Sequence, residues 1–176
     1  MRALVVAALC MSAIGSAAPL PRPSPDFEIH LTPSGQASPA QYKGKVVVLA
    51  FISTTCPHCQ QTAQILSGLQ REYGGRGLQV LGAAFNEMAN MLVPDFNKQF
   101  QPAFPVGWAS RQDVYTYLDH SSVMQLYVPS LVFIDRKGMI RFQYLGDDPF
   151  LQNQEKNLRE TIEALLKEPA AKKKAS

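Results

Sequence analysis

The sequence has few residues that could cross-link the chain or hold a metal: three cysteines and three histidines among 176 residues. We expect Cys10 to be removed with an N-terminal leader, and the remaining pair, Cys56 and Cys59, does not make a disulfide-stapled scaffold. A structural zinc ion usually takes four ligands, and His30 and His120 lie far along the chain from the cysteines, which disfavours a zinc site. A disulfide that closes so short a loop stabilises little, which also disfavours a purely structural bond.

The chain also lacks an apolar run long enough to span a membrane. Residues 1–18 begin with a single positive charge, continue as a short apolar stretch and end with small residues, Ser16 and Ala18, in the pattern of a cleavage site. They predict a cleaved signal peptide and therefore a periplasmic or secreted protein. Leu9 stands where a small residue should precede a lipidated Cys10, which disfavours a lipoprotein.

Composition changes at both ends of the remaining chain. Four prolines within residues 19–25 predict an extended linker without a packed core. Residues 26–168 have the size of one domain and contain no internal repeat. Residues 169–176 predict a disordered basic tail, and since no nucleic-acid motif accompanies its lysines, we expect no nucleic-acid partner. Nothing in the sequence indicates an obligate dimer, so we expect a monomer.

The most informative stretch, Cys56-Pro57-His58-Cys59, joins a predicted strand to a predicted helix. Residues 45–52 are a run of β-branched and other apolar residues, which is typical of a strand. Residues 60–73 repeat their apolar side chains at a helical period. Proline is favoured at the first position of a helix, so Pro57 predicts that Cys56 lies at the helix N-terminus.

This placement has a chemical consequence for the two thiols. The free N–H groups and the positive dipole end of a helix favour an anion, so the Cys56 thiolate should be stabilised. His58 adds a hydrogen-bond donor or a positive charge beside it. Cys59 lies one turn further into the helix, where burial suits a resolving thiol better than an attacking one. The stretch therefore predicts a two-cysteine redox site.

The rest of the chain alternates between predicted strands and helices. Further strands are expected over residues 26–31, 78–85, 104–108 and 127–135, and further helices over residues 91–100, 113–127 and 150–168. The strand over 78–85 completes a β-α-β unit, whose two strands are parallel. The run Asp135-Arg136-Lys137-Gly138 predicts a hairpin turn. Pro129 stands at the start of a strand, where a cis peptide bond can be used.

Together these features resemble the thioredoxin superfamily, and within it the secreted TlpA-like redoxin branch. The resemblance extends over roughly residues 26–167. It rests on the strand, the Cys-Pro-His-Cys stretch and the helix in that order, and on the Val128-Pro129 step before the strand at 131–135. The extra strand at 26–31 and an insert around 90–105 are also similar to that branch. The implied fold is α/β and thioredoxin-like: a central mixed β-sheet flanked by helices, with an N-terminal strand extension and a redoxin-type insert.

The resemblance also implies an activity, that of a thiol–disulfide oxidoreductase. The resemblance implies that Cys56 is the nucleophile, that Cys59 is the resolving thiol, and that Pro129 is a cis-proline packed against the disulfide. The backbone of Val128 would be free to pair with a substrate strand. No cofactor is implied beyond the redox-active Cys56–Cys59 disulfide. The implied partners are proteins that contain cysteine, together with a membrane-bound redox partner.

Some positions differ from the family pattern, and the direction of electron flow depends on them. Thr55 replaces the usual tryptophan, and Ala50 stands where many reducing thioredoxins carry a buried acid that takes the proton of the second thiol. Glu87, at the end of the next strand, could take over this role, as a similarly placed acid does in TlpA-like proteins. Cys-Pro-His-Cys, with His58 stabilising the reduced thiolate, is also similar to oxidising DsbA-like members. The topology favours the TlpA-like reductants, including those of cytochrome c maturation, and leaves an oxidant open.

Two alternatives share the implied fold. His120 is faintly similar to the distal histidine of Sco-like copper-binding proteins, but those proteins space their cysteines three residues apart, whereas two residues separate Cys56 from Cys59 here. Thioredoxin-fold peroxidases place their reactive cysteine in a Pro-x-x-x-Thr-x-x-Cys loop, and no such pattern surrounds Cys56. The copper-binding protein is the stronger alternative.

Overall fold

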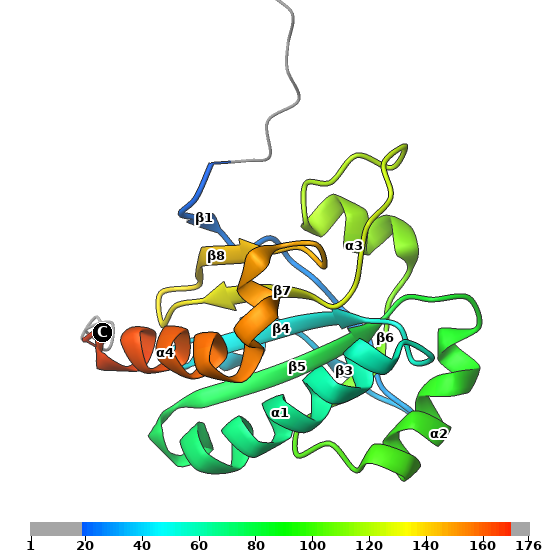
Figure 1. Cartoon of the computed structure of the whole chain (residues 1–176), viewed down its shortest axis with the longest axis horizontal. Helices are drawn as coiled ribbons and strands as arrows, with labels where there is room; N and C mark the ends of the chain where they lie inside the picture. Colours follow the sequence, from blue (N-terminus) through cyan, green and yellow to red (C-terminus); the bar gives the residue numbers. More distant parts are fainter. Residues whose placement is uncertain (1–18, 170–176) are drawn as a thin grey trace, which may run out of the picture.

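The computed structural model describes residues 19–169, which form one mixed sheet with helices on both faces (Figure 1). The sheet has eight strands in the order β1-β8-β7-β4-β5-β6-β2-β3. The strands are β1 (Arg22–Pro23), β2 (Ile29–His30), β3 (Gln36–Ala37), β4 (Val46–Ile52), β5 (Leu78–Ala84), β6 (Val106–Trp108), β7 (Ser130–Ile134) and β8 (Met139–Tyr144). The predicted signal peptide over 1–18, and the predicted tail except its first residue, lie outside the described residues.

The helices divide between the two faces of the sheet. They are α1 (Pro57–Tyr73), α2 (Ala89–Phe100), α3 (Arg111–Tyr117) and α4 (Gln154–Lys167), with the short 3-10 turns η1 (Pro39–Tyr42), η2 (Gly74–Arg76) and η3 (Pro149–Asn153). Buried side chains of α1, α2 and α4 share one apolar cluster, whereas those of α3 belong to a second cluster on the opposite face. The predicted mixed sheet flanked by helices is confirmed.

The central strand β4 explains why the sequence contains an unbroken apolar run. All of its residues are buried. Alternate side chains, beginning with Val46, pack under α1 and α4, while those beginning with Val47 pack on the side of α3. A strand buried on both faces therefore has no polar positions, as expected for the interior of an α/β sheet.

The directions of the strands bring several loops together at the edge of the sheet formed by the carboxyl ends of β4 and β5. Strands β4 and β5 are parallel, with Ile52 opposite Ala84 at their carboxyl ends. Strand β7 is antiparallel to β4, so its first residue, Ser130, lies opposite Phe51 near this same edge. The loops that follow β4 and β5 therefore meet the loop that precedes β7.

The N-terminal segment is more ordered than the sequence predicts. Arg22–Pro23 forms an edge strand against β8. The Arg22 guanidinium donates to the Tyr117 carbonyl oxygen at 2.8 Å, and the Ser24 and Tyr117 hydroxyls lie 2.8 Å apart. The prediction of a linker without packing over residues 19–25 is wrong for this part. Proline is tolerated there because an edge strand leaves one side of its backbone unpaired.

The helix predicted over residues 113–127 is also shorter than expected. Helix α3 ends at Tyr117, and Asp119 follows in the left-handed conformation with φ of 50°. His120 lies directly after the turn rather than in the middle of a helix, and Val123, predicted on the buried side, is 92 % exposed. A left-handed residue interrupts the helical hydrogen bonds, and the chain then returns to the edge where β7 begins.

Most other predicted elements are present, with changes at their ends. The strand expected over 26–31 is reduced to β2, which forms a short hairpin with β3 and pairs with β6. The helix expected over 150–168 begins as the 3-10 turn η3, in which the Asp148 carboxylate accepts the Phe150 N–H. No helix within residues 19–169 has the length and apolar character that crossing a membrane requires.

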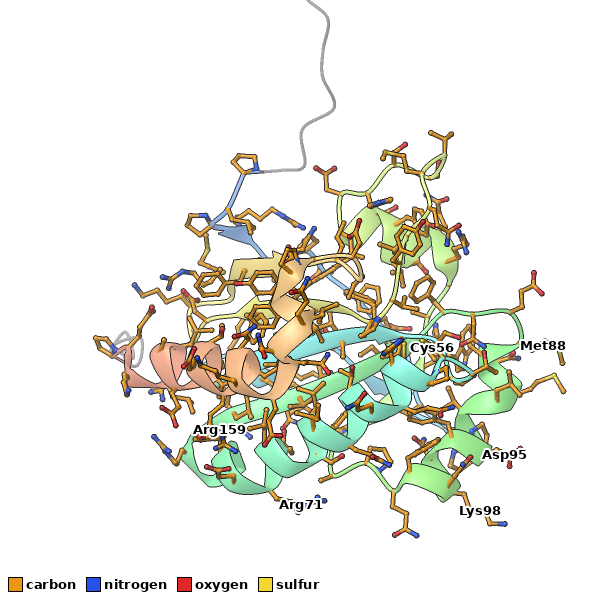
Figure 2. All side chains as sticks on the ribbon, viewed as in Figure 1. Cys56, Arg71, Met88, Asp95, Lys98 and Arg159 are labelled. Atoms are coloured by element: carbon orange, nitrogen blue, oxygen red, sulfur yellow. The ribbon has the colours of Figure 1, made fainter. Side chains whose placement is uncertain are left out.

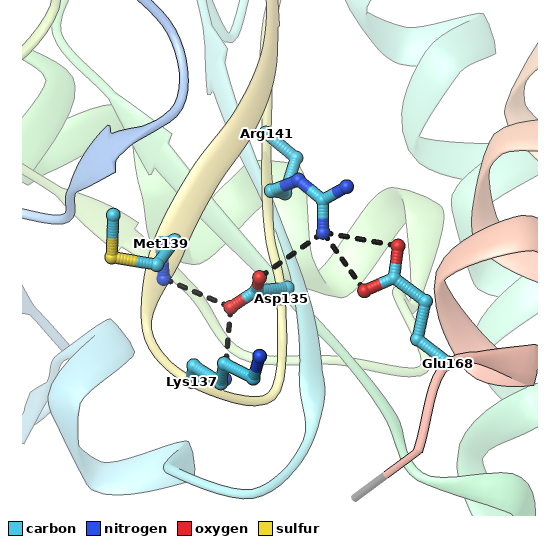
Figure 3. Close-up of polar contacts among 5 residues, drawn as sticks. All are labelled: Asp135, Lys137, Met139, Arg141 and Glu168. Carbon is cyan, nitrogen blue, oxygen red and sulfur yellow. Dashed lines mark hydrogen bonds and ion pairs between the residues drawn. The ribbon is translucent and has the colours of Figure 1, made fainter. Parts of the chain in front are cut away.

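The predicted turn between β7 and β8 is confirmed, and a buried carboxylate holds it (Figure 3). Gly138 takes the left-handed conformation with φ of 82°. One oxygen of Asp135 accepts the backbone N–H groups of Lys137 at 2.8 Å and Met139 at 3.0 Å. The other lies 3.2 Å from the Arg141 guanidinium, which also binds Glu168 at 2.8 Å. Asp135 thus links the hairpin to the end of α4.

We predict that Asp135→Ala lowers the free energy of unfolding by about 2 kcal/mol, because it removes a buried carboxylate that accepts two backbone N–H groups and pairs with Arg141. Urea denaturation followed by circular dichroism measures the change. Glu160→Ala is the control: its carboxylate is exposed and lies 4.0 Å from Lys156, so its loss should cost less than about 0.5 kcal/mol. Equal effects of the two substitutions would contradict the role of Asp135.

Candidate active site

The two cysteines lie where β4 ends and α1 begins, and Figure 2 shows Cys56 at this junction. Cys56 occupies the N-cap position of α1 with extended backbone angles, and Pro57 is the first helical residue, as the sequence predicts. Both cysteines are free thiols. Cys56 is partly exposed, whereas Cys59 is fully buried. One sulfur can therefore meet a partner from solvent while the other stays behind it.

The surroundings of Cys59 keep its thiol protonated. Burial among apolar side chains raises the pKa of Cys59 far above its usual value of 9.0, and the neighbouring Cys56 thiol adds to this rise. The backbone N–H of Ser53 donates to the Cys59 sulfur at 3.4 Å and acts in the opposite direction. Ala50, which replaces the buried acid of many thioredoxins, belongs to the same apolar cluster as Cys59.

The loop before β7 forms the second side of the site. The Val128–Pro129 peptide bond is cis. Pro129 is buried, and Val128 is half-buried against both apolar clusters. Within residues 19–169, no hydrogen bond uses the Val128 N–H or carbonyl group. This backbone is therefore without an internal partner in the described part of the chain.

A glycine brings a further loop against this one. The Gly146 N–H donates to the Tyr127 carbonyl oxygen at 3.2 Å. A Cβ atom on Gly146 would lie about 2.5 Å from the Val128 nitrogen, a distance that only the absence of a side chain permits. The loop between β8 and η3 therefore touches the backbone of the loop that carries Pro129.

An open groove of about 690 Å³ starts beside the cysteine stretch. His58 and Pro129 line one end of it, and it runs between α1 and the segment from η3 to the start of α4. Its walls mix apolar residues such as Leu151 with acidic ones, Asp147 and Glu155 among them. The groove therefore adjoins the cysteine stretch at His58 and the loop before β7 at Pro129.

The site unites most of the predicted residues. Cys56, Pro57, His58 and Cys59 lie at the start of α1, and Val128 and Pro129 lie in the loop across from it. The ring of His58 is exposed and makes no hydrogen bond to either sulfur within residues 19–169.

The structure does not bring Glu87 together with the other predicted site residues. It lies on an exposed turn between β5 and α2. In the described chain its carboxylate makes no hydrogen bond or ion pair with either thiol. It is also not among the groups that shift the pKa of Cys59.

Sequence reasoning missed the residues that hold the cysteine loop in place. The Asn86 side chain, which follows β5, accepts the Thr54 backbone N–H at 2.9 Å. The Gln60 side chain donates to the Thr54 carbonyl oxygen at 3.0 Å. The available signal was an asparagine directly after the strand parallel to the one that leads to the cysteines.

Within residues 19–169, no three His, Cys, Asp or Glu side chains are gathered as the ligands of a metal ion would be. The His120 ring packs edge-on against the Tyr115 ring at 5.4 Å. Its Nδ1 lies 3.0 Å from the Ser121 carbonyl oxygen. The structure therefore does not bring His120 together with the two cysteines.

Comparison with known proteins agrees with this geometry. The model of the AhpC/TSA family matches residues 21–143, well over half of the chain. The chain belongs to the AhpC/TSA family. This family member is also 27 % identical to the thioredoxin-like protein YneN of Bacillus subtilis over 130 residues, which are 70 % of this chain and 69 % of that protein.

Solved structures of thiol:disulfide interchange proteins share the fold of this AhpC/TSA member. A thiol:disulfide interchange protein of the thioredoxin family from Chlorobium tepidum superposes with a TM-score of 0.70 at 22 % identity, covering 85 % of this chain and 99 % of that one. A thiol:disulfide interchange protein from a Bacteroides species gives 0.67 at 16 % identity, covering 87 % and 92 %. The chain therefore has the fold of these two proteins.

We predict that the two thiols differ in reactivity toward iodoacetamide. In a Cys10→Ser background, Cys59→Ser leaves the exposed Cys56, and Cys56→Ser leaves the buried Cys59. A raised pKa reduces the thiolate fraction at every pH below it. Cys59 should therefore react at least roughly tenfold more slowly than Cys56 between pH 6 and 9. Mass spectrometry measures both rates, and unfolding in urea should make them equal. Similar rates in the folded variants would refute the assignment.

Proposed function

We propose that the chain is an extracytoplasmic thiol–disulfide oxidoreductase that exchanges its Cys56–Cys59 dithiol or disulfide with cysteines of other proteins. The observation that carries the proposal is the pairing of a partly exposed thiol at a helix N-terminus with a buried thiol one turn further on. The family and the thioredoxin-like relatives support the same chemistry. No cofactor is needed beyond the disulfide itself.

The proposed reduction proceeds in two exchanges. The Cys56 thiolate attacks a substrate disulfide, so that a bond forms between Cys56 and one substrate sulfur while the other leaves as a thiolate and takes up a proton. Cys59 then gives up its proton and attacks Cys56. The second substrate sulfur leaves, takes up a proton, and the Cys56–Cys59 disulfide remains. The substrate gains two electrons and two protons, which the dithiol loses.

The backbone around Pro129 supports a protein as the substrate. The Val128 N–H and carbonyl group have no partner within residues 19–169, so an extended substrate segment can pair with them beside Cys56. The groove that begins at His58 and Pro129 has room for residues that follow the substrate cysteine. Small thiols would use neither feature.

We propose reduction, as in cytochrome c maturation, as the direction in which the protein works. The argument for an oxidant is that His58 stabilises the reduced thiolate. In the described chain, the exposed ring of His58 makes no hydrogen bond to either sulfur, and Cys59 lies in apolar surroundings. Both observations support a reduced form of the cysteine pair that is stabilised only weakly, as in a reductant. A reductant outside the cytoplasm, reached through the leader at 1–18, needs a membrane-bound partner to supply electrons. No observation favours the copper-binding alternative.

We predict that Cys59→Ser traps a mixed disulfide between Cys56 and a disulfide-bonded protein such as insulin, because the resolving thiol is missing. Non-reducing electrophoresis and mass spectrometry detect the adduct. Cys56→Ser should form none and should not reduce insulin. Adducts of equal yield with both variants would contradict the assigned order of attack.

We predict a reduction potential below about −250 mV for the Cys56–Cys59 pair. Equilibration with dithiothreitol buffers, followed by thiol trapping, measures it. A value of about −120 to −180 mV would overturn the proposed direction and indicate an oxidant or isomerase. A pair that held a stoichiometric metal, and showed no reversible couple, would overturn the function in favour of a metal carrier.

A further inference from the structure

Thr54 lies two residues before Cys56 and is buried, and two side chains form hydrogen bonds with all of its polar groups. The Asn86 carbonyl oxygen accepts the Thr54 backbone N–H at 2.9 Å, and the Asn86 amide nitrogen donates to the Thr54 hydroxyl at 3.1 Å. From the other side, the Gln60 amide donates to the Thr54 carbonyl oxygen at 3.0 Å. We call these three residues the Thr54 clamp.

The clamp fixes a short turn whose backbone touches the buried sulfur. The Cys56 N–H donates to the Ser53 carbonyl oxygen at 3.2 Å, which closes the turn. The Ser53 N–H points to the Cys59 sulfur at 3.4 Å. On the preceding residue, the Ile52 carbonyl oxygen accepts the Phe85 N–H at 3.2 Å. The residues on both sides of Ser53 are therefore held from the loop that follows β5.

We propose that Asn86 is a positioning residue, which holds the Ser53 N–H against the Cys59 sulfur and thereby stabilises the reduced form of the cysteine pair. This inference rests on the proposed thiol–disulfide exchange. Ala50, in the apolar cluster around Cys59, offers no side-chain donor, and of the groups that lower the pKa of Cys59 the Ser53 N–H has the largest effect. The Ser53 N–H is therefore the main polar support for negative charge on that sulfur.

The contribution is greatest in the resolving step. Cys59 must give up its proton before its sulfur forms a bond with Cys56, while the bond from Cys56 to the substrate breaks and the leaving thiolate takes up a proton. A backbone N–H aimed at Cys59 stabilises the thiolate formed at this point. It also donates to the thiol of the resting dithiol. Loss of this donor should slow resolution and make the reduction potential more negative.

Asn86→Ala tests the inference in the full chain, with Asn90→Ala as the matched control. Asn90 is exposed on the first turn of α2 and belongs to no hydrogen bond of the site. Loss of one hydrogen bond should change the equilibrium constant with dithiothreitol about fivefold, which is about 20 mV for this two-electron couple. The potential should move in the negative direction for Asn86→Ala and stay at the wild-type value for Asn90→Ala.

Gln60→Ala provides a second variant, in case Asn86→Ala does not fold. It removes the contact on the carbonyl side of Thr54, and Gln64→Ala on the exposed face of α1 is its control. We expect a negative shift of similar size and a longer lifetime of the mixed disulfide with insulin. The rate at which Cys59 resolves the mixed disulfide should fall. The pH at which this rate is highest should change little if solvent alone accepts the Cys59 proton.

The outcomes separate this inference from the proposed function. A wild-type couple with unchanged potentials in both Asn86→Ala and Gln60→Ala would overturn the positioning role alone, even if both variants melted at lower temperature, because a purely structural role destabilises the oxidised and reduced forms equally. A wild-type protein without a reversible couple would overturn the function and the inference together. A negative shift in the clamp variants, absent from their controls, supports the inference.

Discussion

The burial of β4 on both faces is the constraint on which the rest of the structure depends. Its apolar side chains require cover from α1 and α4 on one side and from α3 with the N-terminal segment on the other. Parallel pairing with β5 and antiparallel pairing with β7 then bring three loops to its carboxyl end. The cysteines, Asn86 and Pro129 meet there because of strand direction, although they are far apart in the sequence.

The same burial separates the roles of the two thiols. Cys56 stands at the N-cap of α1, packs against the edge of the apolar cluster and keeps access to solvent. Cys59 lies one turn inside, where desolvation raises the pKa of its thiol and the Ser53 N–H partly offsets the effect. The two thiols lie one helical turn apart and differ in exposure, so that Cys56 can attack a partner whereas Cys59 is protected from solvent. Chemistry at this site follows from how deep each sulfur lies.

Patterns local in the chain were predictable from the sequence. The strand over 45–52, the helix after Pro57 and the turn at Gly138 each depend on neighbouring residues, and the structure contains all three. The pairing of Arg22–Pro23 with β8 was not predictable, because its partners lie more than a hundred residues away. The early end of α3 was missed because apolar spacing alone did not reveal the left-handed Asp119.

By itself, therefore, the sequence determined the central strands, most of the helices, their order and the pair of cysteines at a helix start, since these depend on periodicity and on the residue types at turns. Only the tertiary structure decided which groups surround the sulfurs. It placed Asn86 and Gln60 on Thr54, aimed the Ser53 N–H at Cys59 and left Glu87 on an exposed turn. The reason is that hydrogen bonds between distant segments depend on strand register and loop path, neither of which is written in local patterns.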